Sequence, residues 1–114
     1  MRTQILGNYL KTYRRKCGLS QRELGLLVGY ANENQVCRHE ASKATPPLLI
    51  ALAYEFIFDT PVSTLFVGFQ SAVAHAVHTN VEEFKRDLER RAEGRPLSAD
   101  TLQKLQWLTE RTTG

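Results

Sequence analysis

The sequence is poor in the features that mark several classes of protein. Its two cysteines, Cys17 and Cys37, are too few for a disulfide framework. The opening MRTQILGNYLKTYRRK is typical of an amphipathic helix rather than of a signal peptide, so we expect a cytoplasmic protein with reduced thiols. No apolar run approaches the ~20 residues of a membrane span, so no membrane association is expected. No segment alternates apolar and polar residues for long enough to predict a strand.

The sets of residues that carry out catalysis or hold a cofactor are also missing. The sequence has no Gly-rich phosphate loop and no nucleophile elbow, so we expect neither enzyme activity nor a cofactor. His75 and His78 lie three residues apart, but no Cys or further His stands near them in sequence, so no metal site is expected. We interpret Cys17 and Cys37 as small buried apolar residues of helices rather than as a redox pair.

The positive charge is concentrated in the first part of the chain. The 114 residues suffice for one domain with an extension, and they carry a net charge of +3. Residues 1–68 hold eight basic and five acidic side chains, whereas residues 69–114 hold seven of each and are neutral. A mildly basic first half fits a polyanionic partner without requiring one.

Helical periodicity runs through the chain and predicts an all-α protein. Ser20 and Glu23 form the pattern of a capping box, and Thr45 and Ser98 are further candidate caps. The expected helices cover about residues 4–17, 20–29, 33–41, 45–56 and 59–66, with two more after residue 68. In the fourth of these, the spacing predicts a buried face made of Leu48, Leu49, Leu52, Ala53 and Phe56.

An apolar stripe about five turns long follows Gly68. Its members recur at steps of three and four residues and are Phe69, Val73, Val77, Val81, Phe84 and Leu88. A small domain has too little surface to cover such a stripe, so we expect it to pair with a second copy; the alternative is that it folds back on its own domain. The predicted organisation is therefore a domain of residues 1–68 and a two-helix extension, residues 69–114, that dimerises.

The stretch YANENQVCRHE, residues 30–40, sets three amides and an arginine around a single valine. A short helix precedes it and Gly29 separates the two, which is the arrangement of a helix-turn-helix. An α-helix fits the major groove of DNA, where Asn or Gln bonds adenine and Arg bonds guanine in bidentate pairs. The competing interpretation is that these amides merely face solvent.

The string LSQRELG, with LKTYRRK before it and VCRHE and PPLLIALAYEF after it, resembles the Cro/repressor-type (Xre-like) helix-turn-helix family over about residues 6–66. The resemblance implies a five-helix, lambda-repressor-like DNA-binding domain in a dimeric transcriptional regulator. It implies a structural ion pair between Arg14 and Glu40. It also implies that DNA is contacted by Gln21, Asn32, Glu33, Asn34, Gln35, Arg38, Ser42 and Lys43.

The chain departs from the family pattern in three places. Seven steps separate Gly29 from the inward Val36, where the family usually has six, so the turn is longer by one residue. Which of residues 32–35 point into the groove is therefore open by one position. His39 stands where the family usually has an apolar residue, and Ser42 stands where it usually has glycine.

These observations lead us to expect a sequence-specific transcriptional regulator, a repressor that binds an inverted repeat in double-stranded DNA as a homodimer. Two copies docked in the family's manner place their recognition helices roughly 34 Å apart, one turn of DNA. One alternative is an antitoxin, in which the C-terminal helices bind a partner protein. Another is a protein-interaction module that does not bind DNA, which the longer turn and the acidic Glu33 favour.

Overall fold

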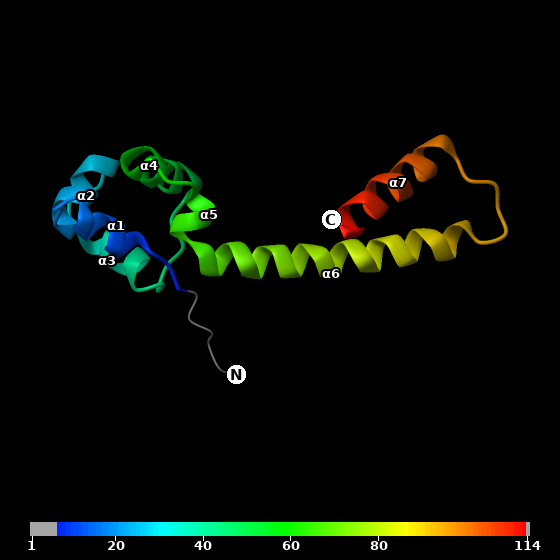
Figure 1. Ribbon diagram of the computed structural model, residues 1–114, viewed down its shortest axis with the longest axis horizontal. Helices are drawn as coiled ribbons and strands as arrows, with labels where there is room; N and C mark the ends of the chain where they lie inside the picture. Colours follow the sequence, from blue (N-terminus) through cyan, green and yellow to red (C-terminus); the bar gives the residue numbers. More distant parts are fainter. Residues whose placement is uncertain (1–6, 114) are drawn as a thin grey trace. The chain divides into compact units, whose positions relative to one another are not determined.

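The computed structural model describes residues 7–113, and within that range the chain is all-helical, as expected, with no strand (Figure 1). The helices are α1 Leu10–Lys16, α2 Gln21–Val28, α3 Asn34–Glu40, α4 Leu48–Phe58, α5 Val62–Leu65, α6 Val67–Ala92 and α7 Ala99–Thr113.

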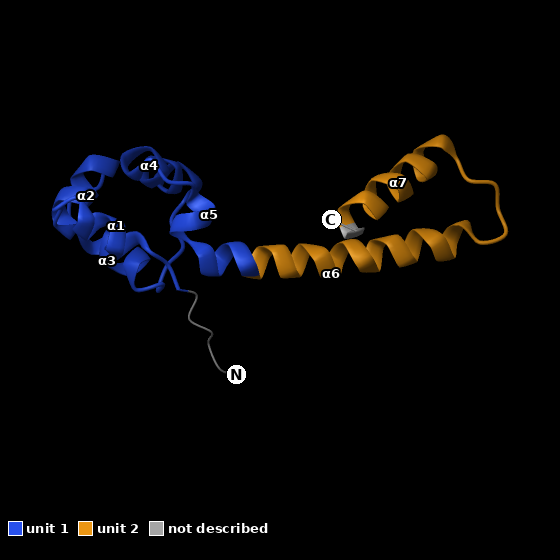
Figure 2. Ribbon diagram, in the orientation of Figure 1, with its two compact units in different colours: residues 1–71 blue, residues 72–114 orange. Residues whose placement is uncertain are grey.

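The chain divides into two compact units, residues 1–71 and residues 72–114 (Figure 2). The first unit contains α1 to α5 and the first turn of α6, and the second contains the rest of α6 and all of α7.

The core of the first unit takes one fully buried side chain from each of its first five helices. Leu10, Leu24, Val36, Tyr54 and Leu65 are all 0% exposed. Burying a large apolar side chain contributes about 1.5–3 kcal/mol, so these five positions hold the helices to one another. None of the short helices α1, α2 or α3 is long enough to be stable in water without this packing.

Two helix starts lie where the sequence predicts them. Ser20 caps α2, because its hydroxyl accepts a hydrogen bond of 3.0 Å from the Glu23 N–H while the Glu23 carboxylate accepts one of 2.8 Å from the Ser20 N–H. The hydrogen bond that the Glu23 carboxylate accepts from the Ser20 backbone N–H, and secondarily its interaction with the Ser20 side chain, lower the pKa of Glu23. Ser98 likewise accepts from the Thr101 N–H at the start of α7.

The first helix begins later in the chain than the sequence predicts. Residues 7–9 are not helical, and α1 begins at Leu10 rather than at residue 4. The N-cap residue is Tyr9, and the side chain of Asn8 just before it accepts a hydrogen bond of 3.0 Å from the Leu10 N–H, which satisfies the first free backbone donor of the helix. The predicted helical residues 4–6 lie outside the described residues.

The buried face of α4 also differs from the one that the sequence predicts. Leu48, Leu49, Leu52 and Phe56 are 73%, 78%, 45% and 87% exposed, whereas Ala51, Tyr54 and Phe58 are buried. The helix is apolar almost all round, so periodicity alone does not select a face. The side that packs into the core is instead the one that carries the small Ala51 and Tyr54, whose hydroxyl has a hydrogen-bond partner there. The helix also begins at Leu48, after Pro47, and no side chain caps it, so the predicted cap at Thr45 is wrong.

The long helix α6 begins at Val67 and continues through Gly68. Phe69, in its first turn, packs against the core of the first unit, with its ring centroid 6.1 Å from that of Phe66. Two backbone hydrogen bonds join the end of α5 and the start of α6 to residues 7–9. The Tyr9 N–H donates to the Leu65 carbonyl at 2.8 Å, and the Gly68 N–H donates to the Gly7 carbonyl at 3.1 Å.

Gly25 is required by a close approach of two backbone segments. A Cβ atom at this position would lie 2.6 Å from the carbonyl oxygen of Asn32, in the turn between α2 and α3. Real Cβ atoms essentially never come so close to another heavy atom. Gly29, with φ at 103°, ends α2 in the left-handed conformation, and the longer turn that follows passes directly over Gly25.

We expect Gly25→Ala to destabilise the protein by about 1–3 kcal/mol, because the turn must move to admit the methyl group. Helix propensity alone predicts the opposite sign, a gain of about 1 kcal/mol. Urea unfolding followed by circular dichroism distinguishes the two, with Arg22→Ala at an exposed position of α2 as the control. A stabilised variant would show that the turn gives way at no cost.

Candidate nucleic-acid interface

The helix α3 turns two side chains inward and leaves its amides and arginine outward. Val36 is 0% exposed and His39 is 1% exposed. Asn34, Gln35 and Arg38 are exposed, and because they lie three and four residues apart they share one side of the helix. We call these three residues the α3 face. None of their side chains is part of the core, so their hydrogen-bonding groups are accessible.

The rotation of α3 is set by a buried ion pair between α1 and α3 and by a hydrogen bond from α2 to the same carboxylate. The Arg14 Nε and Nη2 groups donate to the two carboxylate oxygens of Glu40 at 2.5 and 3.2 Å, and Arg14 Nη1 donates to the Leu19 carbonyl at 2.8 Å. The Gln21 side-chain amide donates to Glu40 Oε1 at 3.0 Å. The side chains of Arg14 and Glu40 are 9% and 4% exposed. The structure thus brings Arg14 and Glu40 together, and it places Gln21 with them at the start of α2.

We expect Glu40→Gln to cost about 3 kcal/mol of unfolding free energy, because it leaves the buried Arg14 guanidinium without its counter-charge. The matched control is Asp87→Asn, which breaks the Arg91–Asp87 pair of 3.0 Å on α6, where the side chains are 76% and 38% exposed. Such an exposed pair contributes at most about 1 kcal/mol. Equal losses in the two variants, measured by urea unfolding, would contradict this account.

Asn32, one of the predicted DNA-contacting residues, forms a local hydrogen bond in the turn before α3. The side-chain oxygen of Asn32 accepts a hydrogen bond of 3.0 Å from the Asn34 N–H, which satisfies a donor at the first turn of α3. Asn32 and Glu33 are both exposed, and Glu33 immediately precedes the helix. The extra turn residue is therefore taken up before α3 begins, next to Gly25.

Ser42 and Lys43 follow α3 in a tight helix end. Ser42 has φ at 58°, in the left-handed region where glycine is usual. The Ser42 N–H donates to the His39 carbonyl at 3.2 Å, and the Lys43 N–H donates to the Arg38 carbonyl at 2.9 Å. This pair of bonds is the Schellman motif, and it holds the backbone of Lys43 in place while its side chain is exposed.

Asn8 is a structural residue that the sequence analysis missed. Its side-chain NH₂ group donates to the His39 carbonyl and to the Ser42 hydroxyl, both at 3.0 Å, while its side-chain oxygen accepts from the Leu10 N–H. The available signal was an Asn shortly before an apolar periodic segment, because Asn side chains often bond free backbone N–H groups near a helix start. Asn8 joins α1 to the end of α3 and to the loop that carries Lys43.

His39 is buried and forms a polar contact inside the core. Its Nδ1 atom and the Tyr54 hydroxyl share a hydrogen bond of 2.8 Å, and the two rings meet edge to face with centroids 5.9 Å apart. Burial, and secondarily the positive charge of Arg38, lower the pKa of His39 from its ordinary value of 6.5. Burial also raises the pKa of Tyr54. The core therefore holds a neutral imidazole against a neutral phenol.

We expect the protein to lose stability as the pH falls below 6.5. The unfolded chain binds a proton at His39 at a higher pH than the folded chain does, so the folded state is favoured above 6.5 and this advantage decreases toward the lowered native pKa. The slope reaches at most about 1.4 kcal/mol per pH unit in that window. Urea titrations at several pH values measure it.

The variant His39→Gln, which retains a hydrogen-bonding side chain, is expected to remove this part of the pH dependence. His75→Gln, at an exposed position of α6, controls for the loss of an imidazole. An unchanged slope in His39→Gln would assign the pH dependence to other groups.

Both cysteines are exposed, which corrects the expectation that they are small buried residues. Cys37 lies on the outer side of α3, because Val36 and His39 occupy the inner side. Cys17 follows the last turn of α1 at the surface.

The second unit has very little core of its own. Among residues 72–111, Leu108 of α7 is the one buried side chain, at 1% exposed. Of the predicted dimerisation stripe, Val73, Val77 and Phe84 are 58%, 52% and 47% exposed. Val81 and Leu88 are half-buried. Phe69, the first residue of the predicted stripe, belongs to the first unit and packs against its core.

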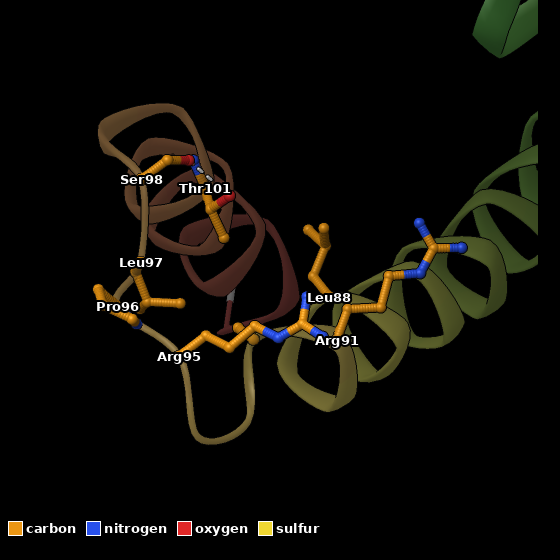
Figure 3. Close-up of a pocket in the computed structure, with 8 residues that line it drawn as sticks. Leu88, Arg91, Arg95, Pro96, Leu97, Ser98 and Thr101 are labelled. Atoms are coloured by element: carbon orange, nitrogen blue, oxygen red, sulfur yellow. Dashed lines mark hydrogen bonds between the residues drawn. The ribbon is translucent and has the colours of Figure 1, made fainter.

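A pocket of about 320 Å³ lies at the turn between α6 and α7, lined in part by Leu88, Arg91, Arg95 and Leu97 (Figure 3). Both arginines are exposed, and Arg91 is paired with Asp87. The Ser98 and Thr101 hydroxyls, which also line the pocket, are 2.9 Å apart and hydrogen-bonded to each other. Within residues 7–113 no group of three or more His, Cys, Asp or Glu residues is placed to bind a metal. No helix in that range has the length and apolar character needed to cross a membrane.

Comparison with known proteins finds no matching family model, no matching curated protein and no matching solved structure.

Proposed function

We propose that the protein is a sequence-specific DNA-binding transcriptional regulator, a cytoplasmic repressor that binds an inverted-repeat operator as a homodimer. In this proposal α1 to α5 form a lambda-repressor-like helix-turn-helix domain, with α2 and α3 as its two central helices. Within this domain α3 is the helix that enters the major groove.

The observation that carries the proposal is the α3 face. Asn34, Gln35 and Arg38 project from one side of a helix whose opposite side is anchored in the core by Val36 and His39. Two amides and a guanidinium on one helical side are the groups that form bidentate hydrogen bonds with adenine and guanine in the major groove. A solvated helix gains little from these side chains, whereas a base-reading helix uses all three.

Exposed basic side chains that neighbour the α3 face in sequence support contact with the phosphate backbone of DNA. Lys43 is exposed directly after α3, and Arg22 is exposed in the first turn of α2. Gln21 lies beside Arg22, and its amide is already directed toward Glu40, which leaves the second N–H of the amide for a phosphate oxygen. Such contacts position the protein on the duplex without reading its sequence.

The small core of the second unit supports a dimer. A pair of helices with one buried side chain among residues 72–111 leaves most of its apolar surface in water. A second copy supplies the missing partner surface if the stripe that includes Val73, Val77 and Phe84 faces the same stripe across a two-fold axis.

An antitoxin is the second candidate, and a feature of α7 favours it. Trp107 and Leu102 are 51% and 52% exposed. Tryptophan is enriched among the residues that dominate binding energy at protein–protein interfaces. Co-purification of the full chain from cells that also express its neighbouring reading frame tests this candidate, and a stable complex with a toxic protein would favour it.

The first experiment on DNA is selection of binding sites from a random duplex pool by the purified full chain at near-physiological salt. Enrichment of an inverted repeat is the expected result. Retention of DNA without enrichment, lost as the salt concentration rises, would leave only non-specific binding and would contradict the proposed function.

We expect Gln35→Ala and Arg38→Ala each to weaken binding to the selected site about tenfold, while binding to random DNA changes little, because a bidentate base contact contributes roughly 1–3 kcal/mol of discrimination. Lys43→Ala is expected to weaken binding to both DNAs and to reduce the salt dependence by about one counterion. Fluorescence anisotropy at several salt concentrations measures these effects.

Lys11→Ala is the matched control for the loss of one positive charge, since Lys11 is exposed on α1. It is expected to bind as the unaltered protein does. If all the variants weaken specific and random DNA equally, the assignment of base-reading and phosphate-binding roles is wrong.

A further inference from the structure

The three most exposed large apolar side chains among the described residues of the first unit lie on one helix, α4, and are Leu48, Leu49 and Phe56. Leu48, Leu52 and Phe56 of α4 recur every four residues and form a row about 12 Å long, with Leu49 beside it. We call these four residues the α4 stripe. They are 73%, 45%, 87% and 78% exposed in the order Leu48, Leu52, Phe56 and Leu49. A contiguous patch of this kind on a soluble protein usually marks an interaction surface.

The chemistry of the α4 stripe excludes several partners. Helix α4 carries one charged residue, Glu55, and its carboxylate accepts a hydrogen bond of 2.8 Å from the Val62 N–H. A nucleic acid or an anionic membrane requires basic side chains on the binding surface, and α4 has none. A two-fold axis sets like against like, so a stripe without charges is suited to contact a second copy of itself.

Three of the four residues of the α4 stripe are spaced symmetrically about Leu52, whereas Leu49, three residues before it, has Glu55 as its counterpart three residues after it. Leu48 lies four residues before Leu52 and Phe56 lies four residues after it. Rows at four-residue spacing on two helices interdigitate in the commonest class of helix packing. A two-fold axis beside Leu52 therefore brings Leu52 against Leu52 of the second copy, and it places each Leu48 against Phe56 of the other copy.

The area of the α4 stripe meets the lower limit for a specific contact. A large aromatic side chain buries roughly 150–250 Å² and a leucine somewhat less, so the stripe offers roughly 500 Å² on each copy. Two copies together reach about 1,000 Å², which is the least that a specific interface requires. A contact of this size holds two chains together when a second contact, such as the one proposed for residues 73–88, also joins them.

We propose that the α4 stripes of two copies pack antiparallel about a two-fold axis at Leu52 and form a second contact within the homodimer. This inference rests on the proposed dimer and goes beyond it, because it assigns a homotypic contact to the DNA-binding unit as well as to the C-terminal helices. The contact limits how the two α3 faces are oriented toward each other and thereby the half-site spacing that one dimer accepts.

Disulfide cross-linking of the full chain tests the contact directly. Cys17→Ser and Cys37→Ser remove the two exposed native thiols, and Leu52→Cys then places a thiol at the axis. We expect most of the Leu52→Cys protein to form a covalent dimer under mild oxidation, because a disulfide needs Cα atoms about 4.4–6.8 Å apart. Ser63→Cys, at an exposed position of α5, measures the background from random collision.

A mixing experiment tests the antiparallel orientation. Leu48→Cys and Phe56→Cys proteins, made in the same background, are expected to cross-link several-fold more when mixed than either does alone. Sedimentation velocity on Leu52→Glu, which brings two carboxylates to the axis, is expected to show a dimer dissociation constant at least tenfold weaker. Thr64→Glu, at an exposed position of α5, is the control for the added charge.

The outcomes separate this inference from the proposed function. Cross-linking of Leu52→Cys no greater than that of Ser63→Cys overturns the α4 contact. If sedimentation then shows a dimer, the proposed homodimer stands without it, and a heterologous partner becomes the candidate occupant of the α4 stripe. If sedimentation shows a monomer, the dimer in the proposed function fails as well. Site selection on random DNA tests DNA binding independently of both.

Discussion

The carboxylate of Glu40 is the point on which the arrangement of the first unit depends. It accepts hydrogen bonds from Arg14 on α1 and from Gln21 on α2, so the last turn of α3 is held to both helices. With position 40 held there and with Val36 and His39 in the core, the opposite side of α3 has to face outward. A helix of seven residues has no stable orientation of its own, and these tertiary contacts supply one.

Both units leave apolar surface in water, and the physical reason differs between them. In the first unit, α4 is apolar almost all round, and a single core covers only the side with Ala51, Tyr54 and Phe58. In the second unit, two helices by themselves enclose little volume, so Leu108 alone is buried among residues 72–111. In the proposed homodimer, pairing with a second copy would remove apolar surface of both units from water.

Local signals in the sequence predicted some of what local interactions decide. The all-helical class, the capping box at Ser20 and the cap at Ser98 depend on residues within one turn of each other, and the structure confirms all three. The wrongly predicted buried face of α4 concerns distant partners, because it depends on the pairing of Tyr54 with His39. No periodicity in the sequence encodes that pairing. The wrongly predicted starts of α1 and α4 are local: the Asn8 side chain bonds the Leu10 N–H, and α4 begins after Pro47 without a side-chain cap.

The sequence by itself determined that the chain is helical, where α2 and α7 begin, and which polar side chains α3 carries, because these follow from hydrogen bonds and spacings within single helices. Only the tertiary structure decided which side of α4 is outward, and it settled the rotation of α3, for which the sequence predicted an inward Val36 but left the outward residues open by one position. These orientations depend on a buried ion pair between α1 and α3 to which Gln21 of α2 is hydrogen-bonded, on a buried His39–Tyr54 hydrogen bond and on the backbone contact at Gly25. Each of these joins residues that are far apart in sequence or separated by a turn, and each is decided only when the helices pack.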